Sequence, residues 1–147
     1  ARRTGATPED RYADWASQAG DPAETLADLF NRLRPDVAIT FDPDTGFTGH
    51  EEHIAISVAT LGAVRRHNTA GGEARLYYTV PADEAGEGDE SIDTAELTRR
   101  GPRDYRRTAW ESWCCYDSQF GSAEQGKDDL FFLQRIDRAY FRSVRSP

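Results

Sequence analysis

The spacing of apolar side chains predicts a helix from residue 22 to residue 33. Four large apolar residues recur at intervals of three or four, which places them on one helical face: Leu26, Leu29, Phe30 and Leu33. The stretch Asp21-Pro22-Ala23-Glu24 supplies a capping Asp, a Pro at the first helical position and a Glu three residues after the cap. The run ends at Arg34-Pro35, because the residue before a proline disfavours helical geometry. We therefore expect a helix with one buried face.

A different pattern follows at residues 37–41, VAITF, where nearly every position is apolar or β-branched. Such a run is typical of a strand that is covered on both faces, as in a parallel sheet. Residues 76–80 have the same character and end at Pro81. Between the two strands, residues from about 50 to 66 predict a helix, with its buried stripe expected at Ile54, Val58, Leu61 and Val64. Alternating helices and strands predict an α/β fold.

The remaining segments give weaker patterns. Residues 82–90 are acidic and rich in Gly, which predicts a mobile surface loop, with a lid over a sugar site as the alternative. A helix is expected from about residue 103 to residue 117, and a further helical or mixed element from 128 to 144. The adjacent Cys114 and Cys115 are badly placed to form an unstrained disulfide with each other, so we expect reduced thiols in a helix. Three aromatic residues follow at intervals of three: Trp110, Trp113 and Tyr116. This spacing indicates a core or interface stripe, or else a surface on which a sugar stacks.

Charge and length narrow the function classes. The 147 residues suit one domain or part of one. With 26 acidic and 18 basic residues the net charge is -8, which opposes binding to nucleic acid or to anionic lipid. No apolar stretch approaches the roughly 20 residues that a membrane-spanning helix needs. The reduced cysteines are consistent with a cytoplasmic location.

Candidate chemistry follows the first predicted strand. The loop at residues 41–49 leaves the carboxyl end of that strand, which is where α/β proteins bind ligands. It leads into His50 and His53, in the first turn of the next helix. Positions three apart are about 60° apart around a helix, so both imidazoles project toward the same region. The helix N-terminus disfavours protonated imidazole, and neutral imidazole is the form that binds zinc. Taken alone, such a pair more often has a structural or solvated role.

Two histidines do not complete a catalytic zinc site, which normally takes three protein ligands. His67, the third histidine, falls at the far end of the same helix and is excluded from the site. Asp42 and Asp44 on the loop are nearer, and three roles stay open for them: metal ligand, hydrogen-bonding partner of ligand or substrate, and turn cap. An acidic residue of the pair at 51–52 could accept the second N–H of a histidine and fix its tautomer.

Residues 34–55, RPDVAITFDPDTGFTGHEEHIA, strongly resemble the second signature of the LmbE-like family, which reads RPDVV, a strand, and then xPDGxTGHPDH. The family comprises zinc-dependent N-deacetylases, among them the GlcNAc-phosphatidylinositol de-N-acetylases and the deacetylases of mycothiol and bacillithiol biosynthesis. Residues 76–79, LYYT, look like the strand that follows in the family, and residues 116–119, YDSQ, look like its late H-x-[S/T]-Q segment. The resemblance implies a Rossmann-like three-layer sandwich with a mostly parallel sheet.

The resemblance also implies a role for each matching residue. His53 would bind zinc, and His50 would protonate the leaving amine or steady the tetrahedral intermediate. Glu52 would orient the catalytic histidine. Thr48 stands where some members have a Tyr that helps to bind the oxyanion, and Gln119 where a polar residue approaches the metal. The implied activity is Zn2+-dependent removal of an acetyl group from an N-acetylglucosamine-type conjugate, a small-molecule partner.

The chain departs from the family pattern at three points. Glu51-Glu52 replaces Pro-Asp between the histidines, and Tyr116 replaces the late His. The first family signature, His-Pro-Asp-Asp-Glu, is absent from the chain, and with it two zinc ligands and the general base. We therefore expect residues 1–147 to be the C-terminal portion of one deacetylase domain whose first strands lie elsewhere. The alternative is a non-catalytic sugar-binding or interaction module derived from this fold. Assembly into a homo-oligomer stays open.

Overall fold

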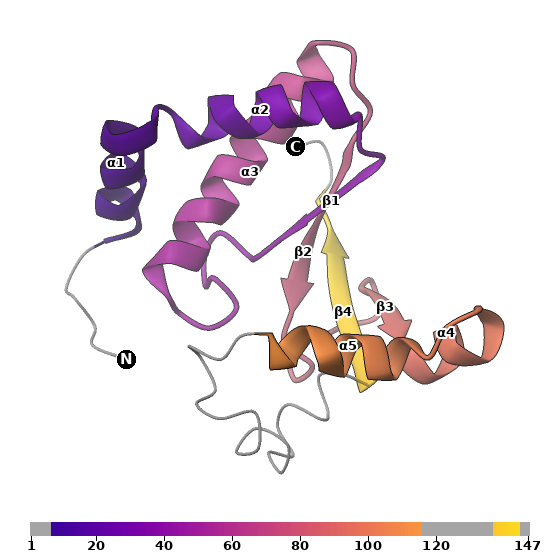
Figure 1. Ribbon diagram of the computed structural model, residues 1–147. Coiled ribbons are helices and arrows are strands. Elements are labelled where there is room, and N and C mark those ends of the chain that lie inside the picture. The colour runs from indigo at the N-terminus through magenta and orange to yellow at the C-terminus, as the bar shows by residue number, and fades with distance from the viewer. Residues whose placement is uncertain (1–6, 116–136, 145–147) are drawn as a thin grey trace. The chain divides into compact units, whose positions relative to one another are not determined.

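The computed structural model describes residues 7–115 and 137–144 (Figure 1). Its elements are, in chain order, α1 (Pro8–Ala19), α2 (Pro22–Leu33), β1 (Val37–Thr40), α3 (Glu51–Thr69), β2 (Arg75–Val80), β3 (Glu90–Asp93), α4 (Thr94–Arg100), α5 (Tyr105–Cys114) and β4 (Arg138–Ser143). They fall into two compact units, residues 1–89 with 141–147 and residues 90–140. The helices and strands that the sequence predicts before residue 81 are confirmed, whereas α1, β3 and α4 were not predicted.

Asp21 joins the three helices of the first unit. Its carboxylate accepts a hydrogen bond from the backbone N–H of Ala23, which confirms the predicted cap of α2. The Tyr12 hydroxyl on α1 donates to the same carboxylate at 2.5 Å, and Arg66 on α3 pairs with it at 2.9 Å. The Tyr12 contact and the flanking groups lower the pKa of Asp21, so the cap is charged at neutral pH.

The sheet of the first unit begins with a parallel pair. β1 and β2 are in register from Val37 opposite Arg75 to Thr40 opposite Tyr78. β4 lies next to β2, and the N–H of Val144, just after β4, donates to the Leu76 carbonyl. The core between this sheet and α3 consists of four buried residues: Ala38, Val64, Ala74 and Leu76. A mixed α/β fold is therefore confirmed.

The buried stripe of α3 differs from the predicted one. Val64 is fully buried as predicted, but Val58 is 47% exposed, and Ala55, Ala59 and Ala63 are almost fully buried although they were not predicted. These alanines are spaced by four, so they form one row along the helix. Helix α3 packs on α2 and α1, and beside the row a Cβ built at Gly62 would lie 3.1 Å from Cβ of Ala23 on α2, so the helices approach closely there. Periodicity marked the large residues, whereas close helix packing favours small ones.

The prediction that β1 is covered on both faces is wrong for the described residues. Val37 is 39% exposed and Ile39 is 52% exposed, while Ala38 and Thr40, on the opposite face, are buried. One face of β1 is therefore covered, with α3 packed on the strand, and the other face is exposed. The three-layer arrangement that the family resemblance implies is not seen in residues 7–115 and 137–144.

The 82–90 segment, predicted as a mobile loop, forms two turns. The N–H of Glu84 donates to the Pro81 carbonyl and the N–H of Asp89 to the Gly86 carbonyl, both at 3.0 Å. Arg142 on β4 then binds the Asp89 carboxylate. The composition suggested mobility because it gave no sign of this distant arginine.

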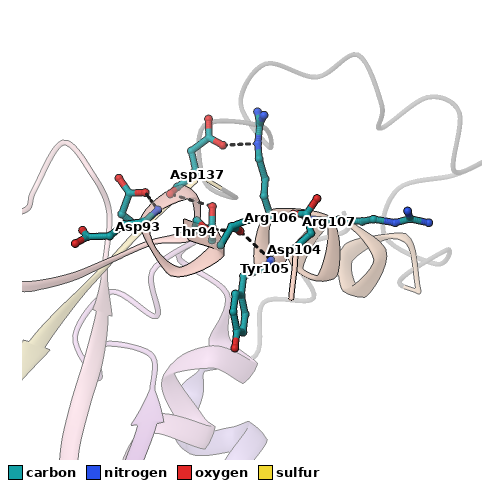
Figure 2. Close-up of polar contacts among 9 residues, drawn as sticks. Asp93, Thr94, Asp104, Tyr105, Arg106, Arg107 and Asp137 are labelled. Atoms are coloured by element: carbon teal, nitrogen blue, oxygen red, sulfur yellow. Dashed lines mark hydrogen bonds and ion pairs between the residues drawn. The ribbon is translucent and has the colours of Figure 1, made fainter. Parts of the chain in front are cut away.

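In the second unit, ion pairs hold the helices to the start of β4. Figure 2 shows Arg106 on α5 reaching Asp137, with 2.7 Å between Nε and the carboxylate. The Thr94 hydroxyl at the start of α4 donates to the Asp137 carbonyl at 3.2 Å. Arg138 pairs with Asp93 at 2.7 Å, and β3 is the neighbour of β4.

Three further expectations concern the C-terminal part. Helix α5 is shorter than the predicted 103–117 helix, and Cys115, just after it, is an exposed free thiol. Of the predicted aromatic stripe, Trp110 is half-buried. The Trp113 side chain is not described, and Tyr116 and Gln119 lie outside the described residues. Of the expected 128–144 element, the structure shows β4. None of the described helices combines the length and apolar character needed to cross a bilayer.

Candidate functional site

The loop between β1 and α3 is folded by Asp42. One carboxylate oxygen of Asp42 accepts the backbone N–H groups of Asp44 and Thr45 at 2.8 and 3.0 Å. The Asp42 carbonyl accepts the N–H of Gly46 at 2.8 Å. Of the three roles left open by the sequence, the structure therefore shows Asp42 as a turn cap. Asp44 is exposed on the same turn.

Gly46 is the position where this loop meets the first turn of α3. Its φ of +61° lies in the left-handed region, which residues other than glycine rarely adopt. A Cβ built at Gly46 would lie 2.9 Å from Cγ1 of Ile54 and 3.1 Å from both the His50 carbonyl oxygen and Cβ of His53. Only a residue without a side chain lets the loop approach the helix this closely.

This approach brings two oxygens to one nitrogen of His53. Nδ1 lies 3.1 Å from the Gly46 carbonyl oxygen and 2.7 Å from the Thr48 hydroxyl oxygen. A carbonyl can only accept a hydrogen bond, so the Gly46 contact assigns the proton to Nδ1, with the Thr48 hydroxyl oxygen as a second acceptor. Neutral His53 then has its lone pair on Nε2. This is the tautomer that binds a metal through Nε2 while its other nitrogen is held by a carbonyl.

Aromatic contacts fix the plane of the His53 ring. The ring stacks on Phe41 with centroids 4.1 Å apart and an interplanar angle of 13°. The His50 ring meets it edge-on, at 5.4 Å and 71°. The expectation that the two imidazoles project toward one region is therefore confirmed. Phe41 was not predicted as a site residue, although its place as the last apolar residue before the loop could have marked it.

Glu52 makes a different contact from the one that the family resemblance implies. Its carboxylate pairs with Nε of Arg11 on α1 at 3.2 Å. Within the described ranges, no hydrogen bond joins Glu52 to His50 or His53. The exposed His50 side chain makes no capping hydrogen bond to its own helix. The orienting role of Glu52 stays a prediction.

Tyr78 lies in the second half of β2, opposite Thr40, the last residue of β1. Burial raises the pKa of its hydroxyl, and the negative charges of Asp42 and Asp44 raise it further. Tyr78 is therefore a neutral phenol close to the acidic turn. The sequence placed it in a strand without assigning it to the site.

The metal-binding capacity of the described residues is limited. Among residues 7–115 and 137–144, no three His, Cys, Asp or Glu side chains come together as a set that could hold a metal ion. His53 offers one ligand atom of the right tautomer. His67 is buried at the far end of α3, with Nδ1 2.7 Å from the Asn31 side-chain oxygen, which confirms its exclusion. Gln119 falls outside the described residues, so its role stays a prediction.

Comparison with known proteins gives a consistent group of relatives. A protein of Saccharomonospora viridis is 38% identical over 65 residues, which cover 44% of this chain and 23% of the relative. One of Salinispora arenicola is 36% identical over 51% of this chain and 24% of the relative. One of Corynebacterium efficiens is 30% identical over 88% and 36%, respectively. All three carry the name 1D-myo-inositol 2-acetamido-2-deoxy-alpha-D-glucopyranoside deacetylase.

These alignments leave most of each relative unmatched, since the chain spans between about a quarter and about a third of their length. No family model and no solved structure matches the chain. The names of the relatives nevertheless agree with the motif at residues 34–55. The resemblance of this chain to the LmbE-like deacetylases is therefore confirmed.

Proposed function

We propose that the protein is a zinc-dependent hydrolase that removes the N-acetyl group from an N-acetylglucosamine conjugate. One observation carries this proposal: the Gly46 carbonyl holds the proton of His53 on Nδ1, which leaves Nε2 ready to bind a metal. The names of the relatives support the reaction and the kind of substrate. A complete Rossmann-like three-layer sandwich is part of the same proposal.

Among the described residues, His53 offers one side chain whose chemistry suits zinc. A neutral imidazole is a preferred zinc ligand, and the remaining ligands would have to come from residues outside the described ranges. When bound, zinc would polarise the acetamide carbonyl and lower the pKa of a water molecule. His53 is the residue that would hold it here.

The other residues act through protons and positions. His50 is exposed beside His53, so its imidazole can deliver a proton to the leaving amine. Thr48 supports His53 through its hydroxyl, which gives it a role in orienting the ligand. Asp42 holds the turn that presents both the Gly46 carbonyl and Thr48.

The competing function is a sugar-binding or interaction module without catalysis. It is favoured by the lack of a three-ligand set among residues 7–115 and 137–144, and by the pairing of Glu52 with Arg11. Such a module would bind the amino sugar and leave its acetamide intact.

Zinc content and amide hydrolysis separate the two functions. The protein expressed from its complete reading frame should contain about one zinc per chain and release amine from an N-acetylglucosaminyl inositol. His53→Ala should lose the zinc. His50→Ala is the matched control, because it removes the neighbouring imidazole and should keep the metal. Sugar binding without zinc and without amine release would establish the module instead.

A further inference from the structure

Arg11 on α1 reaches the first turn of α3. Its Nε lies 3.2 Å from the Glu52 carboxylate and is shielded from water. Glu52 stands between the two histidines of the candidate site, one residue before His53. The ion pair therefore sets the direction of an acidic side chain that neighbours both imidazoles in the sequence.

The residue next to Arg11 anchors α1 by separate contacts. The Tyr12 hydroxyl donates to Asp21, which also caps α2 and pairs with Arg66 near the other end of α3. The Arg11 side chain is only 25% exposed, whereas that of Glu52 is 46% exposed. Because α1 is held at Tyr12, the ion pair draws Glu52 toward α1 and away from the histidines.

The imidazole with unused hydrogen-bonding capacity is that of His50. Nδ1 of His53 already faces two oxygens of the 41–49 loop. The His50 side chain is exposed, and within the described parts of the chain it makes no hydrogen bond. A carboxylate is a strong acceptor for an imidazole N–H. A Glu52 side chain released by Arg11 would therefore have His50, two residues away, as an available partner.

We propose that Arg11 is a positioning residue of the candidate site: by binding Glu52 it keeps this carboxylate away from His50, whose imidazole stays free to act on the substrate. Both partners of the ion pair are partly exposed, and pairs of this kind contribute little to stability, so the importance of this one lies in orientation. The inference rests on the proposed deacetylase function, in which His50 delivers a proton. It replaces the orienting role that the family resemblance implies for Glu52.

Long-range nitrogen–proton NMR of the metal-free protein tests the placement of Glu52 without any need for activity. In the protein made from its complete reading frame, Arg11→Ala should give His50 a new, downfield-shifted imidazole N–H signal, as expected for a hydrogen bond to a carboxylate. The double variant Arg11→Ala/Glu52→Ala lacks that carboxylate and should lose the signal. If Arg11→Ala does not fold, Arg11→Gln removes the charge with less loss of volume and should show the same signal.

Arg66→Ala is the matched control for the NMR experiment. It removes an ion pair near the other end of α3, whose arginine and aspartate are also partly exposed, and frees no carboxylate beside the histidines. Its His50 spectrum should therefore match that of the wild type. An unchanged His50 spectrum in Arg11→Ala would overturn the positioning role.

Kinetics tests the consequence for the reaction. Arg11→Ala should lower kcat for an N-acetylglucosaminyl inositol about tenfold and leave KM within about twofold, because the change affects a proton-transfer group and not substrate binding. Arg11→Lys keeps a cation opposite Glu52 and should restore most of kcat, and Arg66→Ala should keep the wild-type value. An unchanged kcat in Arg11→Ala, or a loss that Arg11→Lys does not restore, would overturn the role in catalysis.

The positioning role and the proposed function fail in different ways. A wild-type protein that releases no amine would overturn the deacetylase function, and with it the catalytic consequence of the ion pair. The His50 signal would still decide whether Arg11 directs Glu52.

Discussion

The Gly46 carbonyl oxygen lies 3.1 Å from Nδ1 of His53 and thereby decides which nitrogen of the imidazole carries the proton. The contact exists because Gly46 adopts a left-handed conformation against the first turn of α3. A backbone feature of the loop thus prepares a side chain of the helix for metal binding.

Replacement of Gly46 should be costly. Gly46→Ala is expected to lower the free energy of unfolding by about 1–2 kcal/mol through left-handed strain and by roughly 1–3 kcal/mol more through the clash with Ile54 and His53. Gly49→Ala is the matched control, since Gly49 has a φ of +73° but nothing lies within 4 Å of its added Cβ. Urea unfolding of both variants measures the difference. Equal decreases in the free energy of unfolding would show that the contact of Gly46 with Ile54 and His53 does not add to the cost.

The tautomer of His53 can be observed directly. Long-range nitrogen–proton NMR of the metal-free protein should show Nδ1 protonated and Nε2 unprotonated. Thr48→Val removes the hydroxyl but leaves the Gly46 carbonyl, so the same tautomer is expected in that variant. Protonation on Nε2 in the wild type would contradict the assignment on which the proposed metal ligand depends.

His50 should matter for turnover and not for the metal. We expect His50→Ala to reduce kcat by about 100- to 10,000-fold, the usual contribution of a general acid, with zinc content unchanged. The measurement is amine release at saturating substrate alongside elemental analysis. A variant with wild-type turnover would remove His50 from the proton-transfer role.

Acid should weaken the fold through Asp89. Its pKa is about 2 in the folded protein and 3.8 ordinarily, so the unfolded chain takes up the proton first as the pH falls. The stabilisation is complete above about pH 4 and is lost progressively between there and pH 2. Urea midpoints measured from pH 2 to pH 5 should fall less steeply in Asp89→Asn than in the wild type. Parallel curves would mean that the pair with Arg142 does not contribute.

Local features of the fold were predictable from the sequence, because their signals lie within a few residues. The Asp21 cap and the β1 strand depend on neighbours in the chain, and so does the pairing of His50 with His53. The ion pair between Asp89 and Arg142 was not predictable, because these residues are 53 positions apart and neither belongs to a distinctive sequence pattern. The pairing of Glu52 with Arg11 likewise needed α1, which the sequence did not indicate.

Gly46 illustrates the boundary between these two cases. A Gly in a loop of turn formers suggests a positive φ, and this much follows from residue type. That its carbonyl meets Nδ1 of His53 depends on how closely the loop approaches α3, which is a matter of packing. The candidate site could therefore be located from the sequence, whereas the tautomer of His53 could not.

The alanine row of α3 ties the site to residues that have no chemistry of their own. Ala55, Ala59 and Ala63 are almost fully buried, and Ala63 lies about 15 Å along the helix axis from His53. Because these positions have almost no free space around them, a larger side chain in the row is expected to displace α3 from its neighbours. His50 and His53 lie at the N-terminal end of α3, so this displacement would move His53 away from the Gly46 carbonyl. The positions of the two imidazoles thus depend on the small size of buried alanine side chains elsewhere on the same helix.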